Sequence, residues 1–210
     1  TLGYPVTGYG IRYDYGIFQQ RIRDGWQIEV PDHWLEGGTP WEIVTPEATR
    51  LVKFGGHTEH WIDEEGRFRV RWVNAVEVLA VPHDVPIPGY RNGTVNTLRL
   101  WQARASEEFD LQVFNDGDYR RAVEEKAISE SISKVLYPPD DQYAGRELRL
   151  KQQYFFVCCS IADILRRHRK THRNLDDFPD KVAIQLNDTH PAIAVLETGE
   201  PFIGQALSVR

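Results

Sequence analysis

The chain has 210 residues, of which 41% are hydrophobic, and its formal net charge is -6. This length allows one large domain or two small ones, and this apolar content suffices for a buried core. The 25 basic residues are spread along the chain, which argues against nucleic acid as a partner. The longest apolar run, residues 154–159, is far shorter than the roughly 20 residues that a membrane span needs.

The two cysteines, Cys158 and Cys159, are adjacent within that apolar run. Adjacent cysteines make a poor disulfide framework, so we expect two buried thiols and a reducing, cytoplasmic setting. Methionine is absent, and the opening TLGYPVTGYG reads as the middle of a domain. We therefore expect a piece of a longer protein.

Short strands are predicted in the first hundred residues, because β-branched and aromatic residues recur in runs bounded by Gly, Pro and Asp. The first are residues 8–13, 26–30 and 41–44. Residues 50–63 and 67–82 form a predicted hairpin around the turn 64–66. In its second half Phe68, Val70 and Trp72 alternate with Arg67, Arg69 and Arg71, which indicates one apolar face and one solvated, charged face.

The next segments differ in proline content. Residues 81–90 contain three prolines, which predicts a rigid connection. Residues 95–105 return to a strand pattern.

Two helices are predicted further along the chain. Residues 118–136 place an apolar stripe at spacings near three and four, made of Tyr119, Ala122, Val123, Ile128, Ile132 and Val135, and this spacing is typical of an amphipathic helix. Pro138 and Pro139 should end it, because proline cannot continue the hydrogen-bond ladder. Residues 145–170 begin polar, become apolar nearly all round, and end in a basic cluster, which predicts a helix buried in its middle.

Residues 182–186 are short, apolar and not alternating, which favours a strand covered on both faces of a parallel sheet. The polar loop NDTHP and the apolar PAIAVLE follow, giving half of a β-loop-α unit. Residues 198–210 have no assigned role.

The NDTHP loop lies where open α/β sheets place their ligands, beyond the carboxyl end of a strand. Asp188 and His190 could act as a carboxylate and imidazole pair, as metal ligands, or as hydrogen-bonding groups for a polyhydroxyl substrate. Alternatively Asn187 or Asp188 makes a turn and Thr189 caps the helix that follows. Spacing alone leaves both interpretations open.

Asp140 and Asp141 lie in the loop after the two prolines. Paired carboxylates can share acid and base duties, but acidic residues ahead of a helix also offset its positive end, and the sequence favours that second interpretation. We expect no metal site, since the chain has no His-Glu-x-x-His, no repeated Cys-x-x-Cys and no calcium loop. A nucleophile elbow and a Gly-rich phosphate loop are absent too.

A basic cluster closes the second helix, residues 166–170. Cations stabilise the negative end of a helix dipole, which is the simpler interpretation. A phosphate or nucleotide site is the alternative.

Four segments, in order, carry a resemblance to a known family: GYGIRYDYGIF, PGYRNGTVNTLRLW, VLYPPDDQYAGRELRLKQQYF and FPDKVAIQLNDTHPAIA. Over residues 1–197 the chain resembles the N-terminal domain of an α-glucan (glycogen) phosphorylase. The resemblance implies an α/β fold, part of a doubly wound GT-B type domain with a β-rich N-terminal portion. It also implies retaining transfer of a terminal α-1,4-linked glucosyl unit to orthophosphate.

The resemblance implies pyridoxal phosphate as cofactor, with its phosphate group serving proton transfer. The lysine that holds it belongs to the C-terminal domain, so we expect no catalytic or cofactor-binding residue in this chain, and no activity from this chain alone.

The resemblance assigns substrate-binding roles to five residues: Asp140, Asp141, Arg149, Asp188 and His190. The loop around Asp140 matches a mobile gate over the catalytic cleft. Asp141 and Gln142 depart from the animal enzymes, which have an asparagine and an aromatic residue there, so control of the gate by an aromatic stack is not implied.

The helix 118–136 matches a helix that packs against its counterpart in a homodimer. Arg166 and Arg167 match a pair that binds the phosphate of an activating nucleotide in animal enzymes. Two alternatives remain: a non-catalytic glucan-binding or dimerisation piece, and a metal-dependent hydrolase that uses Asp140, Asp141, Asp188 and His190.

Overall fold

A computed structural model describes residues 1–106, 115–118, 120, 123–136, 138–139 and 141–185. The strands are β1 Thr7–Ile11, β2 Gln19–Arg23, β3 Trp26–Val30, β4 Ile43–Val44, β5 Arg50–Phe54, β6 His57–Ile62, β7 Phe68–Val73, β8 Val76–Pro88 and β9 Val95–Ala105. The helices are the short 3-10 turn η1 Pro46–Ala48 and the α-helices α2 Glu124–Ser131, α3 Tyr143–Thr171 and α4 Phe178–Lys181.

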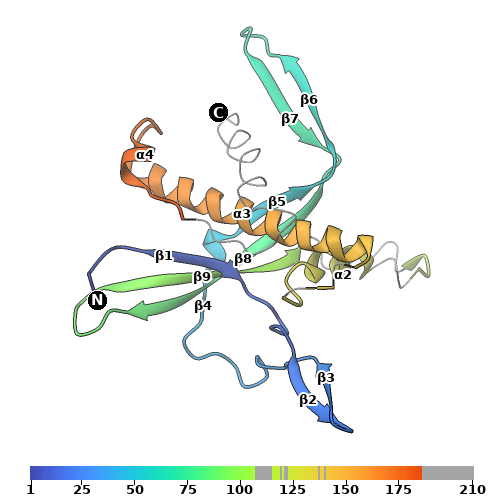
Figure 1. Ribbon diagram of the computed structural model, residues 1–210. Helices are drawn as coiled ribbons and strands as arrows, with labels where there is room; N and C mark the ends of the chain where they lie inside the picture. Colours follow the sequence, from blue (N-terminus) through green and yellow to red (C-terminus); the bar gives the residue numbers. More distant parts are fainter. Residues whose placement is uncertain (107–114, 119, 121–122, 137, 140, 186–210) are drawn as a thin grey trace.

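The main sheet has the strand order β1-β9-β8-β4, and β5 also pairs with β8. The β8 and β9 strands are antiparallel over their whole shared length, whereas β1 runs parallel to β9. Gly8 and Gly10 fit β1 to this place, because a Cβ on Gly10 would lie 3.0 Å from Cδ2 of Leu100. Two hairpins, β2–β3 and β6–β7, project from opposite ends of this body (Figure 1).

Helix α3 lies across the sheet (Figure 1), and the main core forms between them. The sheet contributes mostly small and β-branched residues around Trp101, and α3 contributes Phe155 and the two cysteines. The buried members are Val52, Val78, Ala80, Trp101, Ala103, Ile132, Phe155, Cys158 and Cys159. Both cysteines are free and buried, as predicted.

Several sequence predictions are confirmed. The predicted strands 26–30 and 95–105 are β3 and β9, and the predicted helix 145–170 lies within α3. The β2–β3 hairpin turns at Asp24-Gly25, whose φ angles of 52° and 79° suit the Asp-Gly type of two-residue turn. Among the described helices, none combines the length and the apolar character needed to cross a membrane.

The hairpin predicted around residues 64–66 forms, as β6–β7, and its outer ends continue as β5 paired with β8. The arginine row is exposed and ion-paired, as expected: Arg67 and Arg69 bind Asp63, and Arg71 binds Glu59. The apolar face is less covered than its alternation suggests, since Phe68 is 65% exposed.

The prediction of a rigid connection at residues 81–90 is wrong, because residues 81–88 are part of β8. Pro82, Pro86 and Pro88 are all at even-numbered positions of β8, so their backbone groups point to the same side of the strand. The carbonyl of Pro82 accepts from Thr45 N–H on the β4 side, while the Gly89 N–H faces β9 and donates to Thr94. The prolines therefore turn their missing N–H groups away from β9, and the long ladder to β9 is intact.

The predicted helix 118–136 is shorter in the described residues, where α2 ends at Ser131, before Pro138. The chain leaves the helix because other partners take its backbone groups: the carbonyls of Ser133 and Lys134 accept from Asp14 and Tyr15, and Leu136 N–H donates to Gly16. The apolar stripe is only partly covered. Ile132 is buried, whereas Ile128 is 51% exposed. Tyr119 and Ala122 lie outside the described residues.

The predicted buried strand at residues 182–186 is also wrong for its described part. Residues 182–185 have no regular secondary structure, and three of these four are exposed. A parallel strand needs neighbours for its backbone groups and both faces, and this segment pairs with none of the described strands. The described chain is thus a mixed α/β structure with a β-rich N-terminal part and a later long helix.

Candidate functional site

The loop before α3 contains the first of the predicted site residues. Pro138 is buried, whereas Asp141 is exposed, and the carbonyl of Asp141 accepts from Arg146 at 3.4 Å. Gln142 is the N-cap residue of α3 but makes no side-chain capping bond. Arg149, half-buried, lies in the second turn of α3. Asp141 and Arg149 thus both lie at the N-terminal end of the long helix.

The other predicted substrate-binding residues, Asp140, Asp188 and His190, lie outside the described residues. The meeting of the five residues in one pocket stays a prediction, and so does the convergence that the metal-dependent hydrolase would need. Among the four residues of that alternative, only Asp141 is described.

A buried carboxylate forms the strongest charged centre among the described residues. Asp163, in α3, is 0% exposed. Its Oδ1 lies 2.8 Å from Nη1 of Arg99 and 2.7 Å from Nη2 of Arg166, and its Oδ2 accepts from the Tyr9 hydroxyl at 2.9 Å. Arg50 approaches to 3.9 Å. The Asp163 carboxylate is shielded from solvent, and it is stable in this position because several hydrogen-bond donors surround it.

Arg99 joins this centre to a second carboxylate. Its Nε and Nη2 each donate to Asp84 at 2.7 Å, a two-bond arrangement that fixes the guanidinium plane. The bonds to Asp84 raise the pKa of Arg99, and burial followed by the Asp163 charge raises the pKa of Tyr9 to about 12. Both groups therefore keep their protons at neutral pH.

This centre has more cationic groups than anionic ones, since Arg50, Arg99 and Arg166 share Asp84 and Asp163. Burial, and after it the charge of Arg166, lowers the pKa of Arg50. The Nε and Nη2 atoms of Arg50 are buried without a hydrogen-bond partner in the described part of the chain. Unused donors of this kind favour an anionic group nearby.

The two arginines predicted to bind a phosphate point to different places. Arg166 binds Asp163 inside the centre, whereas Arg167 donates to Thr7 Oγ1 at 2.7 Å. Only Arg167 lines the neighbouring pocket, whose volume is about 400 Å³. Its polar lining includes Thr7, Tyr9, Arg167, His168, His172 and Lys181. Basic and hydroxyl groups around such a space suit an anion.

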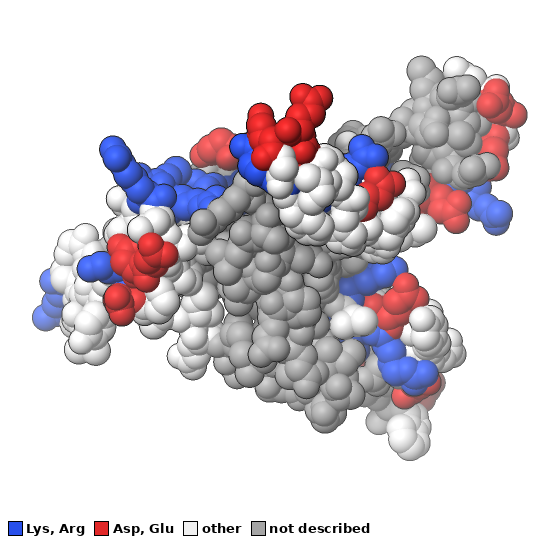
Figure 2. Space-filling view, turned by 90° about the horizontal axis from the view of Figure 1, so that it is seen from above, with Lys and Arg blue, Asp and Glu red and all other residues white. Residues whose placement is uncertain are grey.

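The space-filling view shows Lys and Arg side chains next to Asp and Glu side chains over its described parts (Figure 2). This mixture agrees with the spread of basic residues along the sequence.

Sequence reasoning missed the Asp163 centre and a group of side chains just beyond it. Asp163 is the one acidic residue in the apolar run FFVCCSIADIL, which signals a paired carboxylate. His168 and His172 are spaced four apart in HRKTH, and with Asp177 they could hold a metal ion. A His-Glu-x-x-His motif has the same spacing between its two histidines, but it also requires a glutamate, which this segment lacks. The absence of that motif therefore does not exclude a metal site here.

The comparisons with known proteins agree with the resemblance that the four sequence segments indicate. The family model described as carbohydrate phosphorylase matches residues 1–205. The chain is 54% identical over 197 residues to the glycogen phosphorylase of Synechocystis sp., covering 94% of this chain and 23% of the relative. It is 51% identical over 205 residues to the muscle form of human glycogen phosphorylase, covering 94% of this chain and 24% of the relative.

The chain therefore spans about a quarter of the length of the curated relatives that it matches. The match extends from the N-terminal strands through α3 and includes the loop before it. The level of identity applies to relatives from bacteria and animals alike. This chain belongs to the carbohydrate phosphorylase family.

Proposed function

We propose that this chain is part of an α-glucan phosphorylase, which transfers the terminal α-1,4-linked glucosyl unit of a glucan to orthophosphate with retention. The supporting observation is the continuous match of about 50% identity to proteins named glycogen phosphorylase, over 94% of this chain. The fold that we propose for the whole domain is the doubly wound GT-B type, with residues 1–197 as part of its N-terminal domain.

In this proposal the chain supplies one wall of the glucose pocket. Asp140, Asp141, Arg149, Asp188 and His190 bind the sugar. The carboxylates accept hydrogen bonds and the guanidinium N–H groups of arginine donate them, which suits sugar hydroxyl groups because these both donate and accept. Asp141 is exposed and so has its carboxylate available for such a contact.

The loop 137–142 is the proposed gate over that pocket. Its entry is anchored, because Leu136 N–H donates to Gly16 and Pro138 is buried. The entry is held further by Gln152 of α3, which donates to the carbonyls of Ile132 and Val135. The exit of the loop leads directly into α3, which begins at Tyr143. A loop held at both ends can change conformation between fixed points without disturbing the core.

Pyridoxal phosphate is the proposed cofactor of the whole enzyme, in which its phosphate group would supply proton transfer. Its aldehyde requires a lysine in a protected site, and every lysine of this chain is at least partly exposed. Lys134 and Lys151, moreover, are paired with carboxylates. The residues of this chain therefore do not fit the group, in keeping with a lysine elsewhere, and we derive no step through it.

A homodimer contact through residues 118–136 is part of the proposal. Ile128 on α2 and Val123 at its N-cap are 51% and 42% exposed, and Val135 beyond the helix is 37% exposed. Apolar side chains of this size on one short segment suit an interface. Arg166 and Arg167 were the two arginines expected to bind a nucleotide phosphate. We propose this role for Arg167, because Arg166 is already bound to Asp163.

An exchange of segments tests the proposed function. Residues 1–197 replace the matching quarter of the Synechocystis relative, and release of glucose 1-phosphate from maltoheptaose and orthophosphate is measured. We expect the chimera to be active and the isolated chain to be inactive even with added pyridoxal phosphate. A folded chimera without activity, or an active isolated chain, contradicts the proposal.

His190→Ala in the same chimera separates sugar binding from folding. We expect turnover to fall by more than tenfold, because the variant loses a contact to the reacting sugar. A tenfold fall corresponds to roughly 1.4 kcal/mol of lost transition-state stabilisation. The midpoint of thermal unfolding should change little. Comparable losses in turnover and in stability would make His190 a structural residue.

A further inference from the structure

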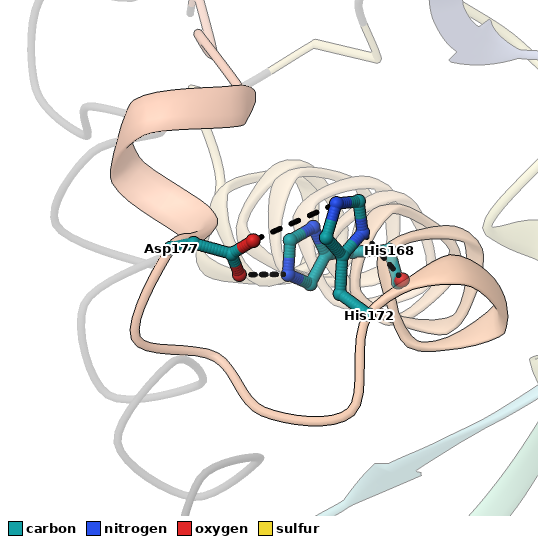
Figure 3. Close-up of side chains that lie close together, drawn as sticks. All are labelled: His168, His172 and Asp177. Atoms are coloured by element: carbon teal, nitrogen blue, oxygen red, sulfur yellow. Dashed lines mark hydrogen bonds and ion pairs between the residues drawn. The ribbon is translucent and has the colours of Figure 1, made fainter.

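Two histidines and one aspartate meet where α3 ends. His168 and His172 are one helical turn apart, and Asp177 approaches them from the loop before α4 (Figure 3). Nε2 of His168 lies 3.2 Å from Oδ1 of Asp177, and Nε2 of His172 lies 3.6 Å from Oδ2. One ligand atom from each residue lies within 4.8 Å of the others.

The second nitrogen of His172 is already occupied. Its Nδ1 lies 2.8 Å from the Thr171 hydroxyl and 3.2 Å from the carbonyl of His168. The other ring nitrogen, Nε2, is the one that faces Asp177, 3.6 Å from its Oδ2. The ligand atoms of the three residues therefore converge on one small space.

The surroundings hold the ring of His168 in place and leave His172 and Asp177 accessible to solvent. The side chain of His168 is 1% exposed and packs edge-on against Phe178, with ring centroids 5.1 Å apart. His172 and Asp177 remain about one-third exposed, at 32% and 37%, so an ion can enter from solvent.

We propose that His168, His172 and Asp177 form a binding site for a divalent transition-metal ion of the Zn²⁺ class. Two imidazoles and a carboxylate are ligands that Zn²⁺ accepts in tetrahedral sites, with bonds of roughly 2.0–2.2 Å. The rings are now stacked, with centroids 4.2 Å apart and planes 5° from parallel. Since each ring must point its lone pair at the ion, the more exposed ring, His172, turns on binding.

The charge of the neighbourhood selects the class of metal. Both histidines line the pocket that also contains Arg167 and Lys181, and these cations oppose an ion held by charge alone. Mg²⁺ and Ca²⁺ need several oxygen ligands, whereas the site offers only one carboxylate. Neutral imidazole nitrogens favour Zn²⁺, Ni²⁺ or Cu²⁺. The fourth position of the ion would face the pocket and hold water or an anion.

A bound ion would join α3 to the segment that leads to α4. His168 belongs to α3, His172 is the C-cap residue of that helix, and Asp177 belongs to the following loop. Binding to the folded chain alone stabilises it by mass action. The inferred site is therefore structural, and it does not depend on the proposed phosphorylase activity.

Calorimetric titration of the 210-residue chain with ZnCl₂ at about pH 7.5, where free imidazole is mostly neutral, tests the site. We expect one ion per chain, and a visible ligand-field absorption when Co²⁺ replaces Zn²⁺. His172→Gln and Asp177→Asn should each weaken Zn²⁺ binding by at least about tenfold, since even second-shell changes cost about 10–100-fold. MgCl₂ should produce no binding heat.

The matched control is the double variant His57→Gln/His60→Gln on β6, which removes two histidines that are exposed on the projecting hairpin. Its Zn²⁺ affinity should equal that of the parent chain. Circular dichroism establishes that each variant is folded. Equal affinity in the parent and in both site variants, or loss of binding only in the control, overturns the proposal.

Discussion

The side-chain amide of Gln152 donates to the main-chain carbonyl of Ile132 at 3.0 Å, from a position where Gln152 is only 6% exposed. The same nitrogen donates to the carbonyl of Val135 at 2.9 Å. One buried side chain of α3 thus satisfies two carbonyls in the segment that leads into the loop 137–142. Backbone bonds to Asp14, Tyr15 and Gly16 also hold this segment, and the amide of Gln152 adds the buried contact to α3.

Replacing Gln152 with leucine keeps the side-chain volume but leaves both carbonyls without their donor. Each buried polar group without a partner costs about 1–3 kcal/mol, and we expect the free energy of unfolding to fall by about 2 kcal/mol or more. Urea unfolding followed by tryptophan fluorescence measures this. Lys151→Ala is the control, because it removes only a surface pair with Glu147, worth about 0.5 kcal/mol or less.

The indole of Trp101 provides a second test of a buried donor. Trp101 is 0% exposed, and its Nε1–H donates to Ser160 Oγ at 3.1 Å. Ser160→Ala should lower the free energy of unfolding by about 1–3 kcal/mol, because the N–H then has no acceptor. Ser131→Ala, which removes a hydroxyl bonded within its own helix turn at an exposed site, should cost less. Equal effects would contradict the assignment.

The Asp84–Arg99 pair predicts a loss of stability in acid. Burial alone would raise the pKa of Asp84, but the hydrogen bonds and charge of Arg99 outweigh it and hold the pKa below its ordinary value of 3.8. Since the folded pKa lies below the unfolded one, the stabilisation is complete above the unfolded value and is lost as pH falls through the folded value.

Asp84→Asn should therefore be less stable than the parent chain at neutral pH, by about 2 kcal/mol for a lost charge-assisted bond. The difference should shrink as the pH falls below about 4, where the parent loses the contribution of the carboxylate. Unfolding free energies measured in urea between neutral pH and pH 2.5 or so decide this. A difference that stays constant down to the lowest pH speaks against the pair.

The adjacent thiols should be unreactive in the folded chain. Burial raises the pKa of Cys158 to about 12, and it also raises the pKa of Cys159 well above its ordinary value. The thiolate is the reactive form, so iodoacetamide should label both cysteines only as fast as the chain opens. Mass spectrometry with and without urea measures the labelling. Rapid labelling of the folded chain would show that α3 does not stay packed on the sheet.

The elements that could be predicted from the sequence have local signals. Residues 95–105 and 145–170 carry their strand and helix patterns within a single run, and burial by the rest of the molecule agrees with those patterns. Pro82, Pro86 and Pro88 indicated a connection outside any strand. They are part of β8 instead, because all three turn their missing N–H groups away from β9 and the ladder to β9 loses no hydrogen bond. Residues 182–185 pair with none of the described strands, so their apolar pattern alone did not make them a strand.

The candidate site divides in the same way. Asp141, Arg149, Arg166 and Arg167 could be proposed through a resemblance, because their segments are continuous in sequence. The Asp163 centre was not found, because its partners Tyr9, Arg50 and Arg99 come from three strands far from α3 in the sequence. Only the tertiary arrangement brings a carboxylate in an apolar helix within reach of them.

The parallel pairing of β1 with β9 sets an order of assembly. Thr7 pairs with Thr97, so a ribosome must add the whole intervening chain before the first strand has its partner, which takes about 5–20 s at ordinary rates of synthesis. The β8–β9 ladder is local by comparison and can close first. During translation, the first strand of the chain is thus among the last pieces of the sheet to be secured.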